Sequence, residues 1–236
     1  GFIRVGGMEK SWEDATDGQI ALDERQCQFL VGLHRAGLPW AYVVSGRRGE
    51  IEVYVGLSGG HHAASHWLAP LQAVFPGCQA APGPLSGEFA QRLRRFPSIA
   101  SVSGNPSASQ SLERHQATQQ FAPPRPRLEQ VFRAMADSEW AYLVAGSPIP
   151  ASDIEAYGAE LALEEQEVVS TYLRAGTAEE HNNPVAEQYV KLLRAARQLH
   201  DEARGTGMWD IQAFLFSDSA QGFARGAHVM SAAFSG

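Results

Sequence analysis

This chain has few cysteines, few positive charges and no long apolar run, and each shortage excludes a class of protein. Only two of its 236 residues are cysteine, and neither Cys27 nor Cys78 has another Cys or a His nearby at metal-ligand spacing. We therefore expect free, reduced thiols rather than a disulfide framework or a structural zinc site. The apolar runs are far shorter than the roughly 20 residues that cross a bilayer, and the N-terminus lacks a signal-peptide pattern. We expect a cytoplasmic protein without a membrane span.

Positive charge is scarce. Lys and Arg number 19 against 26 Asp and Glu, which gives a formal net charge of −7 at pH 7. A domain that binds nucleic acid through its bulk charge needs clustered Lys and Arg. The local basic groups are Arg47 with Arg48, and Arg92 with Arg94 and Arg95. These could contact a phosphate or an acidic partner, or keep a turn and a loop solvated, so direct nucleic-acid contact stays an open question.

Nucleotide-binding and nucleophile motifs are also missing. No G-x-x-x-x-G-K-[ST] occurs, and no G-x-G-x-x-G follows a predicted strand. Ser45 and Ser58 lack the G-x-S-x-G elbow of a hydrolase nucleophile. We exclude a P-loop ATPase within these residues, and we predict no catalytic residue and no cofactor.

The histidines His61, His62 and His66 form the most metal-like cluster in the sequence. His62 and His66 stand at i and i+4 and would share a helix face, but the Glu of H-E-x-x-H is missing and no third ligand stands nearby. We predict a solvated helix start and no metal site. The same interpretation applies to other clusters in which a metal site or catalytic carboxylates are the alternatives: Glu179-Glu180-His181, His200-Asp201-Glu202, and Glu160, Glu164, Glu165 and Glu167.

What the sequence does contain is a repeat. The run W-A-Y-V-V-S-G at residues 40–46 returns one hundred residues later as W-A-Y-L-V-A-G at residues 140–146. The chain has only 5 Trp and 6 Tyr, so two such runs indicate an internal duplication. A period this long does not fit a solenoid and indicates two related α/β half-domains. Trp40, Trp140 and Trp209 fall on strand faces, where we expect core packing rather than a base-stacking platform.

Hydrophobic spacing predicts similar elements around each copy. In the first half, the capping-box pair Asp23 and Gln26 starts a helix that ends at Gly37, and alternation predicts a hairpin over residues 40–55. A helix follows from about Ala63 to Phe75. Residues 80–126 are rich in Pro, Ser, Gly and Gln, and there we expect an edge strand near Phe89–Leu93, a strand over Ile99–Ser103 and a linker over 104–125.

The second half repeats this series with an insertion. A helix over Leu128–Met135 leads into the second W-A-Y strand. Ser152 and Glu155 then form another capping box, which predicts a long helix that ends at Gly176. Its partner begins with a cap and a first-turn proline and ends at a glycine, over Asn183–Gly205.

The last strand and helix complete the predicted fold. The strand Trp209–Phe216 is apolar on both faces, which predicts a central position in its sheet, and a closing helix follows over Ser219–Phe234. We therefore predict an α+β fold of two pseudo-symmetric ferredoxin-like (split βαβ) halves, with a helical hairpin of about residues 152–205 inserted in the second half. The predicted domains are residues 1–103, the linker 104–125, and residues 126–236.

The order of these segments resembles the N-terminal region of HerA/FtsK-like P-loop ATPases, which include conjugation and type IV secretion translocases. The likeness rests on Phe29–Val44, Trp67–Gly77, Leu128–Pro148 and Gly207–Phe216. In that superfamily such a region commonly precedes a P-loop motor. The Walker lysine, the acidic residue and the arginine finger of the motor have no counterparts here. The resemblance therefore implies a non-catalytic domain on a hexameric ATPase ring, which mediates assembly or contact with a partner.

These observations lead to one functional expectation and two alternatives. The chain starts at Gly1 without a methionine and stops at Gly236 after an apolar helix, so we expect a fragment of a longer polypeptide. We expect the assembly or partner-docking domain of an ATP-driven DNA translocase, a homo-oligomer that is hexameric when joined to its motor and that contacts an unidentified protein. The alternatives are a small metal-dependent enzyme that uses the cluster His61, His62 and His66, and a stand-alone structural or adaptor protein.

Overall fold

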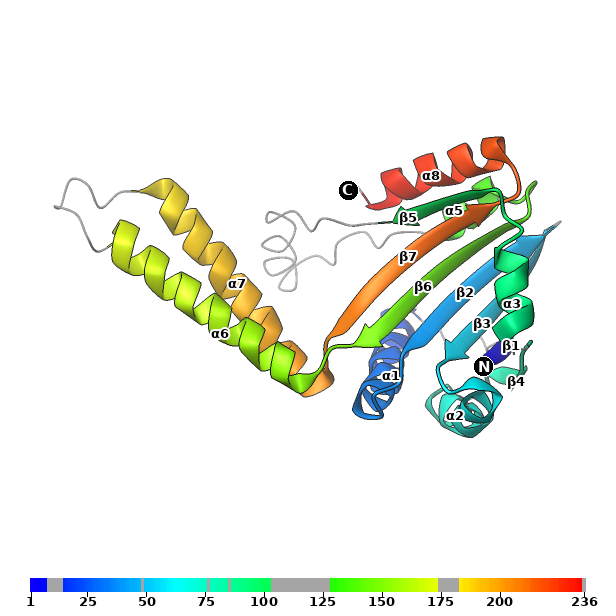
Figure 1. The fold of residues 1–236 in the computed structure, drawn as a ribbon, viewed down its shortest axis with the longest axis horizontal. Helices are drawn as coiled ribbons and strands as arrows, with labels where there is room; N and C mark the ends of the chain where they lie inside the picture. The colour runs from blue at the N-terminus through cyan, green and yellow to red at the C-terminus, as the bar shows by residue number, and fades with distance from the viewer. Residues whose placement is uncertain are drawn as a thin grey trace. The chain divides into compact units, whose positions relative to one another are not determined.

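The chain is an α+β protein with one seven-stranded antiparallel sheet and seven α-helices within the described residues (Figure 1). The computed structural model describes residues 1–7, 15–47, 49–75, 77–84, 86–102, 128–173 and 183–234. They belong to two compact units. Unit 1 comprises the described residues within 1–102, 128–148 and 209–234, and unit 2 comprises those within 149–173 and 183–208. The predicted linker 104–125 lies outside the described residues.

Unit 1 contains all seven strands. They lie in the order β4-β1-β3-β2-β6-β7-β5, and every neighbouring pair is antiparallel. The elements of this unit are β1 (Phe2–Gly7), α1 (Ala15–Arg35), β2 (Trp40–Arg47), β3 (Glu50–Leu57), α2 (Gly60–Val74), β4 (Gln79–Pro82), α3 (Ser86–Leu93), β5 (Ser98–Val102), α5 (Leu128–Ala134), β6 (Trp140–Pro148), β7 (Trp209–Ser217) and α8 (Ala220–Phe234).

The two W-A-Y strands, β2 and β6, pair with each other at the middle of the sheet. Their register is reciprocal, because Trp40 lies opposite Gly146 and Trp140 lies opposite Gly46, with Val43 opposite Leu143 at the centre. A Cβ atom built on either glycine would overlap the indole of the tryptophan from the other strand. Each run therefore needs glycine six residues after its tryptophan, because the indole of the opposite strand fills that space.

Four helices cover one face of the sheet, which we call the helical face. Phe29 and Leu33 of α1 and Leu71 of α2 pack with Ile3 and Leu57 into one cluster. On the other half of the sheet, α5 and α8 cover β6 and β7 through the buried residues Val131, Met135, Trp140, Tyr142, Leu215 and Met230. Trp40 and Val44 alternate with Val43 along β2 and belong to these two clusters, so all four helices lie on the same face.

The opposite face, which we call the α3 face, is covered in part by α3. Phe89 of this helix packs with Val43 and Tyr54 from the sheet. Phe96, which follows the helix, packs with Phe216 of β7. On this face Val43, Ser45 and Tyr54 are buried.

Unit 2 is a helical hairpin formed by α6 (Ala151–Val168), a single π-helical turn η1 (Val169–Leu173), and α7 (Pro184–Thr206). Leu161 and Val168 of α6 pack against Val190 and Leu193 of α7 in a cluster of their own. The predicted cap of α7 is confirmed, since the Asn183 side chain accepts a 3.1 Å hydrogen bond from the Ala186 amide. None of the helices in the described ranges is long and apolar enough to cross a membrane.

Several sequence-based predictions of local structure were wrong in the first half. The helix α1 begins at Ala15, well before the Asp23 capping box, and the strands β1 and β4 were missed. These strands are formed through pairing with distant strands, β1 with β3 and β4 with β1, so their own sequences show little. The segment Phe89–Leu93, predicted as an edge strand, belongs to the helix α3, in which these two residues, four apart, share one face.

The second half follows the predictions more closely. The strand predicted over Ile99–Ser103, within the predicted first half 1–103, is β5 at Ser98–Val102, and it pairs with β7. The predicted central position of β7 is confirmed, because β7 is paired on both sides, with β6 and β5. The predicted capping box at the start of α6 was wrong. The residue before this helix is Pro150, which has no side-chain cap, and the Ser152 hydroxyl donates to Asp153 instead. Gly176, the predicted end of the helix, lies outside the described residues.

Candidate functional site

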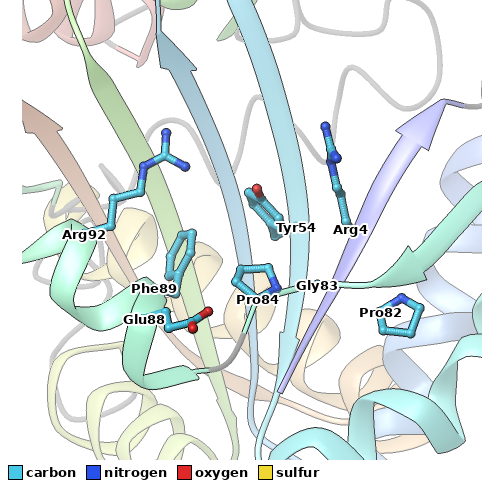
Figure 2. A pocket seen from close by; sticks show the side chains of 8 residues that line it. All are labelled: Arg4, Tyr54, Pro82, Gly83, Pro84, Glu88, Phe89 and Arg92. Carbon is cyan, nitrogen blue, oxygen red and sulfur yellow. The ribbon is translucent and has the colours of Figure 1, made fainter.

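The most developed hollow among the described residues lies on the α3 face, beside the first turns of α3. It has a volume of about 340 Å³ and is lined by Arg4, Tyr54, Glu88, Phe89 and Arg92, together with Pro82, Gly83 and Pro84 of the turn after β4 (Figure 2). In this view Tyr54 lies between the two guanidinium groups. The hollow is therefore lined by an aromatic ring with a guanidinium group on each side of it.

The strands and the turn after β4 hold this hollow in shape. The Gly83 amide donates a 2.8 Å hydrogen bond to the Phe2 carbonyl oxygen, which fixes the turn against β1. A Cβ on Gly83 would lie 3.0 Å from that same oxygen, so the turn approaches β1 closely because it has no side chain there. The Phe89 ring lies 4.5 Å from the Phe2 ring and 5.4 Å from the Tyr54 ring, measured between centroids.

A chain of ion pairs runs from the hollow across the sheet. The Arg92 Nη1 donates to Glu52 Oε2 at 2.9 Å, and Arg4 Nη2 lies 3.7 Å from Glu52 Oε1. On its other side Arg92 Nε lies 3.8 Å from Glu139 Oε1, and Arg47 Nε lies 3.6 Å from Glu139 Oε2. Two carboxylates thus face three guanidinium groups. Each guanidinium has a carboxylate within 4 Å, so the network holds the strands and α3 together and leaves little charge for a ligand.

The two titratable groups at the centre of the network keep fixed protonation states near neutral pH. Burial acts to raise the pKa of Glu52, but hydrogen bonds from Arg92 and Tyr54 and the charges of Arg92 and Arg4 outweigh it and hold that pKa below its ordinary value. The pKa of Tyr54 is raised, first by burial and then by the neighbouring Glu52 carboxylate. An ionised carboxylate and a neutral phenol suit binding and positioning, whereas general acid–base catalysis needs a pKa near the working pH.

The sequence identified part of this site. It singled out Arg47 and Arg92, and the structure brings both to one carboxylate, that of Glu139. The arginines Arg94 and Arg95 are exposed in the turn after α3, and Arg48 lies outside the described residues.

The residues that sequence reasoning missed in this site are Arg4, Glu52, Tyr54 and Glu139. The sequence did carry a signal for Glu52 and Tyr54, because they alternate with the apolar residues of β3 and therefore lie on the opposite face of that strand. The contribution of Arg4 and Glu139 follows only from the pairing of distant strands.

The histidines for which a metal site was the alternative are spread along the solvent side of a helix. His61 and His62 lie in the first turn of α2 and His66 lies one turn further, all three exposed. Over the described ranges no group of three or more His, Cys, Asp or Glu side chains could hold a metal ion. Both cysteines are free, with Cys27 exposed and Cys78 buried.

The other predicted clusters divide into three cases. Glu160, Glu164 and Glu167 are exposed on α6, as expected for a solvated face, and Glu179-Glu180-His181 lies outside the described residues. Glu165 is engaged by two arginines of α7, Arg194 Nε and Arg197 Nη1, each at 2.7 Å.

The prediction of a solvated helix end was wrong for His200. This side chain is buried, its Nε2 lies 2.7 Å from the Ile154 carbonyl oxygen, and its ring fills the space that a Cβ on Gly158 would need. His200 stands among polar residues in the sequence of α7, and this pattern predicted a solvated position. Its burial depends on Gly158 of α6, which has no side chain and so leaves space for the imidazole. The cause therefore lies in the partner helix.

The tryptophans pack as predicted rather than forming an exposed stacking platform. Trp140 is 1% exposed and stacks on Phe132, with ring centroids 4.8 Å apart. Trp40 and Trp209 are half-buried and meet edge to face at 5.9 Å.

A second candidate site is the edge of the sheet at β5. Within the described residues β5 pairs with β7 alone, whereas β1, which lies near the other end of the sheet, pairs with both β3 and β4. The five residues of β5 contain no charged side chain and no proline, and Ile99 is exposed. Native edge strands that avoid pairing with other chains commonly use Lys, Pro or bulges, and β5 has neither of the first two.

Comparison of the chain with protein-family models, with curated proteins and with solved structures finds no match. The function of the chain is therefore inferred from its own residues and their geometry.

Proposed function

We propose that this chain is a non-catalytic assembly or partner-docking domain of an ATP-driven DNA translocase, working in the cytoplasm as part of a homo-oligomer. The single observation that best supports this proposal is the reciprocal pairing of β2 with β6, which joins two halves into one broad sheet. The resemblance of the segments around these strands to the N-terminal region of HerA/FtsK-like ATPases supplies the class of motor.

The topology supports an interpretation of the sheet as two duplicated ferredoxin-like halves. The first half runs β1-α1-β2-β3-α2-β4 with strand order β4-β1-β3-β2, which is the split βαβ arrangement. The second half runs β5-α5-β6-β7-α8 with strand order β6-β7-β5, and the helices α6 and α7 stand between β6 and β7 in the chain. The second half follows the same order of elements up to its last helix, α8. No described strand takes the place that β4 has in the first half.

This correspondence indicates how docking would take place. In the first half β4 follows α2 and adds to the outer edge of β1, antiparallel, with Arg4 opposite Ala81. By analogy, an extended segment of a neighbouring subunit would add to the outer edge of β5. Strand addition gives affinity through main-chain hydrogen bonds and leaves specificity to side chains on alternate positions.

The first test concerns the motor. The coding frame should continue from this chain into a segment with G-x-x-x-x-G-K-[ST], and the complete protein should form a hexamer by mass photometry and hydrolyse ATP. Deleting residues 1–236 should leave the nucleotide site intact but reduce ring assembly or partner recruitment. An in-frame stop codon directly after Gly236, or a large closed assembly of the isolated chain by light scattering, would contradict the proposal and favour a stand-alone structural protein.

A pair of proline variants in β5 tests the docking edge. Successive backbone amides of a strand point alternately toward β7 and away from it, so Ala100→Pro and Ser101→Pro remove one amide of each kind. One variant should lose stability, and the other should fold normally yet fail to dock in the complete assembly. If both folded variants assemble as well as the unchanged protein, the β5 edge is not the docking surface.

A further inference from the structure

The helix α7 in unit 2 has two apolar rows, an inner row buried against α6 and a second row at the edge of that contact, in which Ala196 also packs against the shared cluster. The inner row packs against Leu161 and Val168 through the buried residues Ala186, Val190 and Leu193. A second row, which we call the outer seam, consists of Val185, Tyr189, Leu192, Ala196 and Leu199.

The outer seam has the spacing of a helix-packing surface. Its members recur at intervals of four and three residues, which is the heptad pattern by which one α-helix receives another. Val185 is 77% exposed and Leu199 is 48% exposed, and Tyr189 is also exposed. Leu192 and Ala196 between them are half-buried, so the seam presents apolar surface to solvent chiefly through Val185, Tyr189 and Leu199.

The border of the outer seam on the α6 side is acidic. The Tyr189 hydroxyl donates a hydrogen bond to Glu164, which places that carboxylate beside the seam. Glu160 and Glu167 stand four residues before and three after Glu164, so they share its side of α6 and are exposed as well. We call these three glutamates the acidic rim. The helix α6 contains no Lys and no Arg.

Two of the positive charges of α7 lie on another side of the hairpin. Arg194 and Arg197 both bind Glu165, which follows Glu164 by one residue and is therefore turned about 100° away around α6. The row Leu161–Val168 lies between these two glutamates on the helix surface. The other border of the seam, on α7 itself, consists of Gln188, Ala195 and Glu202, and the exposed Lys191 stands beside Gln188 and Ala195. The border on the α6 side is therefore the acidic one.

We propose that the outer seam and its acidic rim form a docking groove for an amphipathic helix of a partner protein, whose apolar face is bordered by Lys or Arg. The heptad spacing selects a helix, and the sign of the rim selects a basic one. A second copy of this chain fits less well, because it would offer the three glutamates of the acidic rim only Lys191 from beside its α7 border. This surface is separate from the β5 edge, and its test is independent of the proposed translocase function.

The test uses two synthetic helical peptides of about 21 residues, three heptads, with identical leucine rows bordered by Lys in one and by Glu in the other. Their binding to the full chain is measured by fluorescence anisotropy at low salt and at about 0.15 M salt. The basic peptide should bind, and the acidic peptide should bind at least about tenfold more weakly. Equal binding of both peptides, or binding of neither, would overturn the proposal.

Paired variants separate the seam from non-specific attraction to an acidic protein. Leu192→Glu with Leu199→Glu should weaken basic-peptide binding about tenfold or more. The control Ile51→Glu adds the same kind of charge at a position in unit 1 that is 58% exposed, and it should leave binding unchanged. Far-UV circular dichroism verifies that each variant keeps its helices.

Charge reversal provides the second pair. Glu160→Lys, Glu164→Lys and Glu167→Lys together should reverse the preference in favour of the acidic peptide. The matched control reverses the exposed acids Glu50, Asp210 and Asp218 of unit 1 and should keep the original preference. If both triple variants behave alike, overall charge explains the binding and the groove is excluded. If sedimentation shows the chain self-associating through a contact that Leu192→Glu with Leu199→Glu dissolves, the seam belongs to a second copy and the proposal fails.

Discussion

The strands β2 and β6 have nearly the same sequence and pair with each other, yet their tryptophans lie in different surroundings. Trp140 is sealed under the flat ring of Phe132 from α5. Trp40 is half-buried, meets the edge of Trp209, and its Nε1 has no hydrogen-bond partner in the described residues. Local sequence therefore determines the strand and its register, whereas the helix above each strand determines how deeply its tryptophan is buried.

The α3 face shows a second difference between the halves. Ser45 of β2 lies opposite Glu52, and the corresponding pair in the second half is Ala145 opposite Gln212. The next pair, Val43 with Tyr54, corresponds to Leu143 with Phe214. The first half thus has a charged, hydrogen-bonded surface where the second has neutral and apolar side chains. Substituting residues of one half into the other tests which differences matter.

The largest effect is expected at the buried tryptophan. Trp140→Ala should reduce the free energy of unfolding by about 3–5 kcal/mol, because it empties a closely packed space beside Phe132. Trp40→Ala should cost clearly less, because its indole is already half-exposed. Urea denaturation followed by circular dichroism measures both variants, and equal losses would show that burial on the two halves is equivalent.

The glycines opposite the tryptophans should show the same ranking on a smaller scale. Gly46→Ala should cost about 1–3 kcal/mol, because the Cβ meets the immobile Trp140 indole. Gly146→Ala should cost less, since the half-buried Trp40 has solvent to move into. Gly87→Ala in α3 is the control, where nothing lies within 4 Å and the helix gains propensity. Urea midpoints rank the three, and the comparison fails if Gly146→Ala is the more damaging of the strand pair.

Ser45→Ala should stabilise the protein by about 1 kcal/mol, because it removes a buried hydroxyl that lacks a partner. Ser45 is 2% exposed, and its Oγ has no hydrogen-bond partner in the described residues. The second half already has alanine at the corresponding position, Ala145. The reverse change, Ala145→Ser, should be close to neutral, because that position is half-buried. A rise in the thermal midpoint for Ser45→Ala checks the expectation, and a fall would reveal a hydrogen bond from this hydroxyl.

The smallest effect is expected for Glu52→Gln, which gives the first half the amide found at Gln212. The folded-state pKa of Glu52 is lowered, so its contribution to stability is complete above the ordinary value of 4.5 and is lost as pH falls through the folded pKa. At neutral pH the loss should stay below about 1 kcal/mol, because the side chain is 30% exposed. The variant and the unchanged protein should converge in stability at acidic pH, measured by denaturation between neutral pH and pH 3.

Sequence reasoning reached the elements that depend on local pattern and missed those that depend on distant partners. Alternation predicted β2, β3, β6 and β7, and the repeat predicted that the two W-A-Y segments are related. The strands β1 and β4 were missed because they are short and exist through pairing with each other and with β3. The same limit applied to the α3-face network, where Arg92 was noted but its partners Glu52 and Glu139 lie 40 and 47 positions away in the chain.

The reciprocal register of the central strands has a consequence for the halves taken alone. The two runs have nearly the same sequence and pair antiparallel in a symmetric register. Two copies of either run can therefore pair with each other in the same way. A separately expressed first half would expose β2 and could join a twin molecule across a two-fold axis, with Trp40 of one set against Gly46 of the other. If the two runs descend from one copy, as we propose, the strand pairing that unites this polypeptide is the pairing that would have joined two single-copy chains in a homodimer.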